Sequence, residues 1–239
     1  MTTARETTDP KRINLDAAAF FGLPTTRRIR SDTSIGLSDR SYLPKVDDPR
    51  SDWVASVAVP AFLALAQTGI EAQDFCSVGT GAGLDALAAI EILNAKNIVI
   101  TDLHDDVVSL ARENILSNTF AGDGLTVYAG VGDLLTPIKS ENIKLDLIYE
   151  NLPNIPIGDS ESISNGQNSS TFILSREEHI PDFVSRNLIT LHYLALKQAR
   201  PLLRDGGHVL SSIGGRIPLE AILNLGSATG YDSEIITFT

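Results

Sequence analysis

The chain has 239 residues, 43% of them hydrophobic, which suits one sizeable α/β domain with a short appendage. Thirty acidic residues against 19 basic ones give a formal net charge of −11, which disfavours nucleic acid as a partner. No apolar run approaches the roughly 20 residues that span a bilayer and no secretory signal is visible, so we expect no membrane association. The single cysteine, Cys76, excludes an internal disulfide and fits a cytoplasmic protein.

The first 50 residues differ from the rest of the chain. They show weak periodicity and are rich in Asp, Arg, Ser, Thr and Pro, which predicts an irregular leader or lid (1–50) in front of a domain at 51–239. A basic run at 25–32 is typical of a solvated turn. Apolar residues then recur at a spacing near that of a helix over 51–69, where Pro60 is predicted to kink the helix or to begin it.

From residue 74 onward, short apolar segments alternate with amphipathic ones. This alternation predicts a doubly wound, mostly parallel α/β sheet with helices on both faces, a Rossmann-like fold. A Ser/Asn/Gly-rich insertion at 158–172 interrupts it. The predicted strands are 74–78, 97–102, 124–130, 144–150, 207–214 and 234–239, and the predicted helices are 83–95, 104–118, 182–203 and 218–230.

Three glycines lie between the first strand and its helix, in the segment SVGTGAG. Gly79, Gly81 and Gly83 permit a tight turn, and their missing Cβ atoms let a ligand approach the backbone. In a parallel sheet this turn stands at the edge where ligands bind, with backbone amides facing an anionic or polar group. We therefore predict a ligand site at this turn.

An acidic residue ends the next predicted strand. Asp102 follows Gly83 by 19 positions, a spacing at which a carboxylate accepts hydrogen bonds from both hydroxyls of a ribose. Nicotinamide and S-adenosylmethionine enzymes share this arrangement. A dinucleotide fingerprint counted from Gly79 wants a glycine at position 84, which is Leu84, and the relaxed register from Gly81 begins two residues late. A nicotinamide-dependent (NAD(P)) oxidoreductase stays open as an alternative.

Residues 50–239 resemble the class I S-adenosylmethionine-dependent methyltransferases. SVGTGAG is similar to their first motif, GVGDLL to the segment whose acid meets the adenine amine, and LDLIYENLPNIP to the fourth motif, whose loop points at the methyl group. The resemblance implies S-adenosyl-L-methionine as cofactor. It implies cofactor contacts by Gly79, Thr80, Gly81, Gly83, Asp102, Leu103, Asp133 and Leu134, catalytic roles for Asn151 and Pro153, and substrate contacts by Tyr149, Glu150, Leu152, Asn154 and Arg216.

The sequence departs from the family pattern at two places. The acidic residue usual two places before the first glycine is Ser77 here, so Asp85 is the candidate substitute for holding the methionine amino group. The fourth motif of amino-methylating members reads Asn or Asp, Pro, Pro, then Tyr or Phe, whereas residues 151–154 read Asn-Leu-Pro-Asn. Asn154 cannot stack on an extruded base as the aromatic residue of ribosomal RNA adenine methyltransferases does, so we expect no nucleic-acid substrate.

The layout is also similar to the methyltransferase part of plant methionine S-methyltransferase, which has a strand ending in Gly-Gly-Arg, as residues 214–216 do here. We therefore expect methyl transfer to a nitrogen or sulfur of a small amino-acid-like metabolite, oriented by Asn151 and the carbonyl preceding Pro153. Protein glutamine N-methylation and a catalytically silent cofactor-fold binding protein are the alternatives. We expect no metal, because the four histidines and Cys76 lack ligand spacing.

The predicted last strand, 234–239, leaves no residues for the hairpin with which class I methyltransferases close their sheet. A bare apolar edge there would invite pairing with another strand. We therefore expect the N-terminal segment or a second copy of the chain, as a homo-oligomer, to cover this edge. Truncation of a longer protein after Thr239 is the third alternative.

Overall fold

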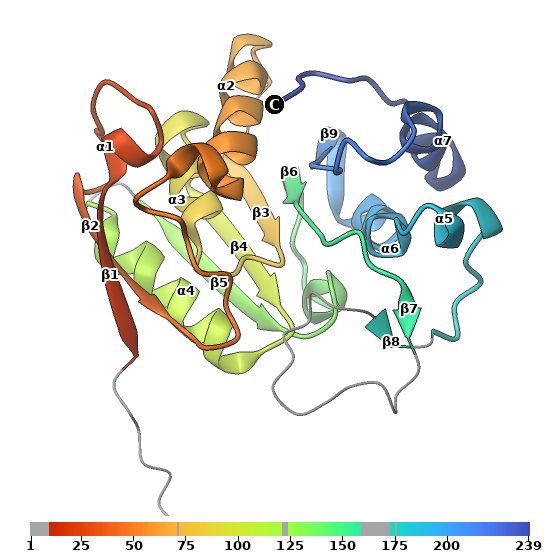
Figure 1. The fold of residues 1–239 in the computed structure, drawn as a ribbon, viewed down its shortest axis with the longest axis horizontal. Coiled ribbons are helices and arrows are strands. Elements are labelled where there is room, and N and C mark those ends of the chain that lie inside the picture. The colour runs from red at the N-terminus through yellow and green to blue at the C-terminus, as the bar shows by residue number, and fades with distance from the viewer. Residues whose placement is uncertain (1–9, 71, 121–123, 159–172, 175) are drawn as a thin grey trace, which may run out of the picture.

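The computed structural model describes residues 10–70, 72–120, 124–158, 173–174 and 176–239. Its centre is a five-stranded parallel sheet in the order β5-β4-β3-β6-β9 (Figure 1). The chain enters the sheet at its central strand, moves outward to β5 and crosses to the other side at β6. This reversal puts a topological switch point at the carboxyl ends of β3 and β6, where doubly wound sheets bind ligands. The strands are β3 (Asp74–Val78), β4 (Asn97–Asp102), β5 (Thr126–Val131), β6 (Leu145–Glu150) and β9 (Leu203–Ser211).

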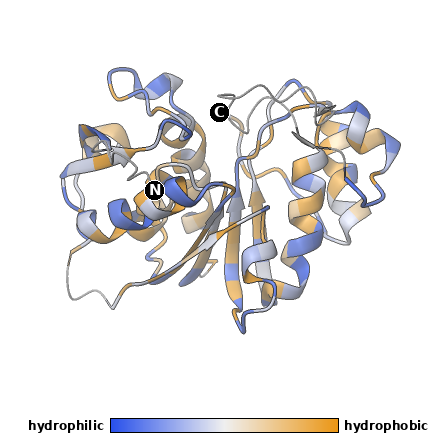
Figure 2. Ribbon diagram, turned by 90° about the horizontal axis from the view of Figure 1, so that it is seen from below, coloured by the Kyte–Doolittle hydropathy of each residue, from blue (hydrophilic) through white to orange (hydrophobic). Residues whose placement is uncertain are grey.

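Alternate strand positions pack into two separate apolar cores, one on each face of the sheet. Phe75 and Leu147 belong to one core, and their neighbours Cys76 and Ile148 belong to the other. The three central strands, β3, β4 and β6, are buried along most of their length, whereas the edge strands β5 and β9 are partly or fully exposed at most positions. Figure 2 shows apolar strand segments between the flanking helices. The first core is covered by α2 (Val59–Gln67), α3 (Leu84–Ile92) and α4 (Asp105–Asn118), and the second by α5 (Asp182–Arg186), α6 (Thr190–Ala199) and α7 (Leu219–Thr229).

The predicted fold class is confirmed, and five of the six predicted strands form. The long predicted helix at 182–203 is wrong as a single element, because the chain breaks between α5 and α6. Asn187 ends α5 by donating its side-chain amide to the carbonyl of Phe183 at 2.7 Å, and Leu188 adopts a φ of 58°. A non-glycine residue in this left-handed region cannot continue a right-handed helix.

The predicted strand at 234–239 is also wrong. Gly230, with a φ of 82°, ends α7, and residues 231–239 form no strand. Instead, this segment runs from α7 towards α2, where the C-terminal end lies (Figure 1). Ile236 packs against the first core, whereas Phe238 is 82% exposed. Partial burial of Ile236 thus takes the place of the predicted strand, and β9 is the outermost strand on this side of the described sheet.

The described part of the N-terminal segment is an ordered hairpin attached to α4. Its elements are β1 (Lys11–Asp16), α1 (Ala17–Phe20) and β2 (Asp32–Leu37), with β1 antiparallel to β2. The Asn114 side chain accepts from the Gly36 amide at 2.8 Å and donates to the Gly36 carbonyl at 2.9 Å, and Asn118 binds Ser34 in the same way. Residues 11–20 and 32–37 thus form regular elements, whereas the chain between them is irregular, and the action of residues 1–50 as a leader or lid stays a prediction.

The chain between β2 and α2 passes the start of α4, directly after the end of β4. Ser38 donates to the Asp106 carboxylate, and Arg40 forms an ion pair with it at 2.8 Å. The chain then forms η1 (Pro49–Ser51) and a π-helical turn, η2 (Val54–Ala58), before α2. Pro60 lies in the first turn of α2, as predicted, directly after the π-helical turn η2.

Candidate functional site

The glycine turn after β3 has the backbone conformation that only glycine adopts without strain. Gly79, Gly81 and Gly83 have φ angles of 70°, 52° and 80°. A Cβ at Gly83 would lie 3.1 Å from the carbonyl oxygen of Ala111, so this glycine lets α3 pack against α4. A Cβ at Gly81 would meet nothing within 4 Å. The open space over Gly81 fits the predicted approach of a cofactor to the backbone.

Asp102 connects the end of β4 to this turn. Its Oδ2 accepts a hydrogen bond from the Gly81 amide at 3.1 Å, and its Oδ1 accepts one from the Leu103 amide at 2.8 Å. Burial raises the pKa of Asp102, and these hydrogen bonds oppose that shift. An ionised carboxylate has about four acceptor positions. Positions therefore remain on Asp102 for the two ribose hydroxyls that the sequence predicted it to bind.

We expect Asp102→Ala to weaken binding of S-adenosylhomocysteine by about 1 to 3 kcal/mol, the cost of losing hydrogen bonds to a charged group. Titration calorimetry measures this directly. The matched control is Asp105→Ala, which removes an exposed carboxylate three residues further on. Equal affinity of the Asp102 variant and the wild-type protein would disprove the ribose role.

Asp85 places its carboxylate against Ser77, the residue that stands where the family has an acid. Ser77 donates its hydroxyl to Oδ2 of Asp85, and Oδ1 accepts the Ala86 amide at 2.8 Å and the Thr80 hydroxyl at 3.5 Å. Asp85 is 7% exposed, and burial raises its pKa to about 6. The first turn of α3 thus brings a carboxylate to the end of β3, as the sequence predicted for a substitute acid.

The predicted adenine segment follows β5. Asp133 lies beside Leu134, whose φ of 51° is unusual for a non-glycine residue and costs about 1 kcal/mol or more. Arg176 binds both Asp133 oxygens, with Nη1 3.1 Å from Oδ1 and Nη2 2.6 Å from Oδ2. No pattern in the sequence indicates this pair, because Arg176 follows the polar insertion and is 43 positions from Asp133. An adenine amine has to share the Asp133 carboxylate with this arginine or displace it.

We expect Arg176→Ala to raise the affinity for S-adenosylhomocysteine about five- to tenfold, because it removes a competing ion pair that is only partly exposed. Arg186→Ala is the control, since among the described residues the Arg186 side chain bonds only to the carbonyl of Asp182 on its own helix. In the double variant with Asp133→Ala the gain should disappear. Weaker binding by Arg176→Ala would mean that the arginine supports the cofactor.

The loop at 151–154 follows β6 and reaches the glycine turn. Leu152 Cδ2 lies 3.3 Å from the position of a Cβ on Gly79. The Leu152 amide donates to Oε2 of Glu150 at 3.3 Å, and Asn154 Oδ1 accepts the Gly214 amide at 3.3 Å. Asn151, between these fixed points, is partly exposed, and its side chain has no hydrogen-bond partner among the described residues. Its amide group is thus available to a substrate.

The remaining candidates lie in different surroundings. Tyr149 is 2% exposed, packs edge-on against Phe62 and accepts a hydrogen bond from Ser212 at 3.2 Å. Glu150 is fully buried on the opposite face of the sheet and binds His192. Arg216 is exposed in the loop after β9. Pro153 is half-buried between Leu152 and Asn154. The substrate roles of these residues stay predictions.

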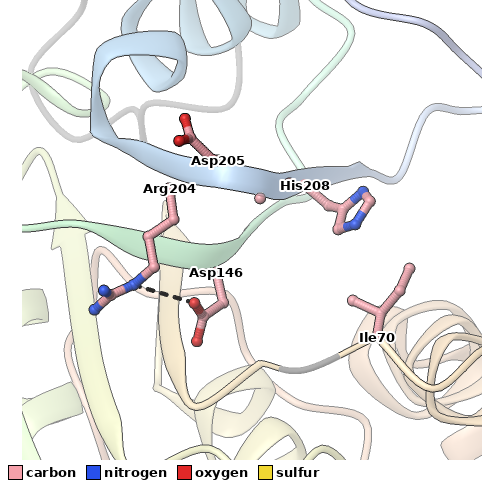
Figure 3. Close-up of a pocket in the computed structure, with 7 residues that line it drawn as sticks. Ile70, Asp146, Arg204, Asp205 and His208 are labelled. Atoms are coloured by element: carbon pink, nitrogen blue, oxygen red, sulfur yellow. Dashed lines mark ion pairs between the residues drawn. The ribbon is translucent and has the colours of Figure 1, made fainter.

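A small pocket lies at the other end of the sheet, where β6 and β9 begin. Its lining includes Ile70 and His208 beside the ion pair of Arg204 with Asp146, whose Nε and Oδ1 are 3.2 Å apart (Figure 3). The pocket is remote from the glycine turn because that turn follows the carboxyl end of β3. Among the described residues, no group of His, Cys, Asp and Glu could hold a metal ion, and no helix is long and apolar enough to cross a bilayer.

Comparison with known sequences places this site in a functional context. Residues 61–157 match the family described as ribosomal protein L11 methyltransferase (PrmA). Over 137 residues the chain is 26% identical to the release factor glutamine methyltransferase of Streptococcus pneumoniae (strain ATCC BAA-255 / R6). That alignment covers 57% of this chain and 44% of the relative, so the chain spans less than half of the relative's length.

Solved structures share the fold. A SAM-dependent methyltransferase from Agrobacterium tumefaciens is 11% identical with a TM-score of 0.51, over 95% of this chain and 60% of that one. A ribosomal protein L11 methylase from Lactobacillus delbrueckii subsp. bulgaricus is 19% identical with a TM-score of 0.48, over 82% and 83% of the two chains. The Agrobacterium structure supports the α/β fold across nearly the whole chain.

Proposed function

We propose that this chain, which carries a class I S-adenosylmethionine-dependent methyltransferase domain, transfers a methyl group to a nitrogen or sulfur of a small amino-acid-like molecule. The likeness to methyltransferases supports S-adenosylmethionine as the cofactor, as the sequence predicted. The residues around the glycine turn fit it. Gly81 faces open space, Asp102 keeps acceptor positions free, and Asp85 offers a carboxylate.

One observation carries the proposal, namely that the side chain of Asn151 has no hydrogen-bond partner among the described residues, although the loop around it is fixed. The loop is held at Glu150, Leu152 and Asn154, and Leu152 contacts the glycine turn. An amide in this position can accept a hydrogen bond from an acceptor N–H through its Oδ1. The Leu152 carbonyl, which precedes Pro153, supplies a second acceptor oxygen.

The chemistry requires positioning more than acid–base catalysis. When bound, S-adenosylmethionine supplies a sulfonium methyl group together with its own leaving group. The chain holds the acceptor atom in line and excludes water, which supplies on the order of 7 to 11 kcal/mol of barrier reduction in well-oriented reactions. An uncharged amine, amide or thioether already carries its lone pair. A dedicated base is therefore not needed, and Asn151 orients the acceptor.

A second candidate, N-methylation of a glutamine side chain in a protein, is favoured by the likeness to the release factor glutamine methyltransferase. It needs the same nitrogen acceptor and the same use of Asn151. The sequence departs from the usual motif of that candidate at the first proline, which is Leu152 here, whereas the second is kept as Pro153. The two candidates thus share a mechanism and differ in the size of the acceptor.

The deciding experiment incubates the protein with methyl-labelled S-adenosylmethionine and a cell extract divided into small molecules, proteins and RNA. We expect label in the small-molecule fraction. Label in protein, located on glutamine, would replace the first candidate by the second, and label in RNA would overturn both. Binding of S-adenosylhomocysteine without transfer to any fraction would support a silent binding protein.

A further inference from the structure

A glutamate and a histidine meet inside the second core, directly behind the loop at 151–154. Glu150 is the last residue of β6, and His192 lies in α6. Nδ1 of His192 is 2.8 Å from Oε1 and 2.7 Å from Oε2 of Glu150, and both side chains are 0% exposed. Because a carboxylate only accepts, Nδ1 is the donor in this contact.

The same carboxylate also holds the backbone of the loop. Oε2 of Glu150 accepts the Leu152 amide at 3.3 Å, while the Glu150 carbonyl accepts the Ser212 amide at 2.9 Å from the chain after β9. A continuous path of hydrogen bonds thus runs from α6 through Glu150 to the backbone of Leu152. Leu152 in turn lies against Gly79, and its carbonyl follows Asn151 in the chain.

Packing alone does not require this pair. Removing an ionisable pair from water is costly, and apolar residues of similar volume often stabilise a core as well or better. The cost is evident at His192, because its Nε2 is buried without a hydrogen-bond partner among the described residues. What an apolar pair could not supply is an acceptor for the Leu152 amide.

We propose that Glu150 and His192 are a positioning pair that fixes the backbone of Leu152, and through it the direction of the Asn151 side chain and of the Leu152 carbonyl. The inference rests on the proposed methyl transfer at Asn151. It assigns no contact with substrate to either residue. Glu150 therefore orients the site from behind, whereas the sequence predicted that it contacts the substrate. His192 acts by holding the Glu150 carboxylate.

The test is a double variant, Glu150→Met with His192→Leu, which replaces the pair by apolar side chains and is expected to fold. Amide hydrogen exchange of the ligand-free protein should show Leu152 exchanging about tenfold faster or more, with the amides of β3 unchanged. Transfer of label, in the extract fraction that the wild-type protein labels, should fall about tenfold or more. Affinity for S-adenosylhomocysteine should stay within about threefold.

Two further variants separate positioning from general stability. Glu150→Gln keeps an acceptor oxygen, so it should restore slow exchange at Leu152 and most of the turnover. Ile148→Val, two residues earlier in β6 and in the same core, should change neither. If the double variant does not fold, the comparison of Glu150→Gln with Glu150→Met alone decides the question.

Wild-type turnover in the folded double variant, or unchanged exchange at Leu152, would overturn the inference. So would a Glu150→Gln protein as slow as the double variant. Failure of the proposed function looks different, because the wild-type protein itself would then transfer no label to any fraction. The exchange at Leu152 still tests the backbone contact in that case, since it is measured without cofactor or acceptor.

Discussion

Replacing Asn151 with alanine is expected to lower the turnover of methyl transfer by about 10²-fold, while the affinity for S-adenosylhomocysteine stays within a few-fold. The asymmetry follows from the geometry of the loop. Asn151 makes no hydrogen bond to the described residues, so its removal leaves no protein partner unsatisfied. The lost interactions are those with the acceptor, and misplacing the reacting atom by about 1 Å costs roughly that factor.

Single-turnover kinetics with labelled cofactor and calorimetry with S-adenosylhomocysteine give the two quantities separately. Asn187→Ala is the matched control, because Asn187 is a partly buried asparagine whose side chain, within the described part of the chain, bonds only to the Phe183 carbonyl on α5. It should lower stability without changing turnover. Equal losses of turnover and cofactor affinity in the Asn151 variant would assign Asn151 to folding or to cofactor binding.

The sequence predicted the part of the site that depends on local pattern. The three glycines of the turn indicate it because glycine adopts a positive φ without strain, as Gly79, Gly81 and Gly83 do. The apolar segments on either side place this turn between a strand and a helix. Asp102 follows by the same logic, since parallel strands end at one edge. The glycine turn and the place of Asp102 beside it were therefore predictable from the sequence, whereas the cofactor contacts of these residues stay predictions.

The contacts that tune this site were not predictable, because each joins residues far apart in the chain. Arg176 binds Asp133 across the polar insertion, and His192 meets Glu150 only because α6 packs behind β6. His192 sits in an apolar helix, and there the sequence favoured simple packing. Neither pair has a spacing or composition that marks it, so only the tertiary fold brings them together.

Errors in the predicted elements have the same origin. The N-terminal hairpin shows weak apolar periodicity. Its strand β2 is attached to α4 through hydrogen bonds of the Asn114 and Asn118 side chains to its backbone, in addition to apolar packing. Residues 234–239 have strand-like composition, yet Ile236 packs, partly buried, against a core that the sequence could not place beside it. Tertiary contacts decide such short segments over local propensity.

Asp85→Asn is expected to stabilise the ligand-free protein at neutral pH and to weaken cofactor binding. Burial raises the pKa of Asp85 from an ordinary value of 3.8 to about 6. Between these two values the folded protein binds a proton that the unfolded chain has released. The contribution of Asp85 to the free energy of unfolding is therefore most favourable below pH 4, and it is lost as the pH rises through about 6. Above that pH the penalty is on the order of 3 kcal/mol, at 1.36 kcal/mol for each pKa unit.

Asparagine removes the buried charge, its Oδ1 still accepts the Ala86 amide, and its Nδ2 donates to the Ser77 hydroxyl in place of the bond that Asp85 accepts there. Urea unfolding should show a gain of about 2 to 3 kcal/mol at pH 8 that vanishes near pH 4. Asp105→Asn, which changes an exposed acid, should show no such gain. Lower stability of the Asp85 variant at pH 8 would disprove the unfavourable buried charge.

The buried Asp85 carboxylate lowers the stability of the ligand-free protein, and none of the hydrogen-bond donors around it is a cation. A cationic group of a ligand would supply the missing opposite charge. If Asp85 takes the place of the acid missing at Ser77, it meets the amino group of the cofactor's methionine moiety, and S-adenosylhomocysteine should bind more tightly to the wild-type protein as the pH rises through about 6. The Asp85→Asn protein should lose this pH dependence and bind about 10- to 100-fold more weakly at pH 8, the value of a charge-assisted hydrogen bond. Calorimetry of both proteins at pH 5 and pH 8 measures the two effects together. A parallel pH dependence in the two proteins would place the amino group elsewhere and leave Asp85 as a group that only destabilises the fold.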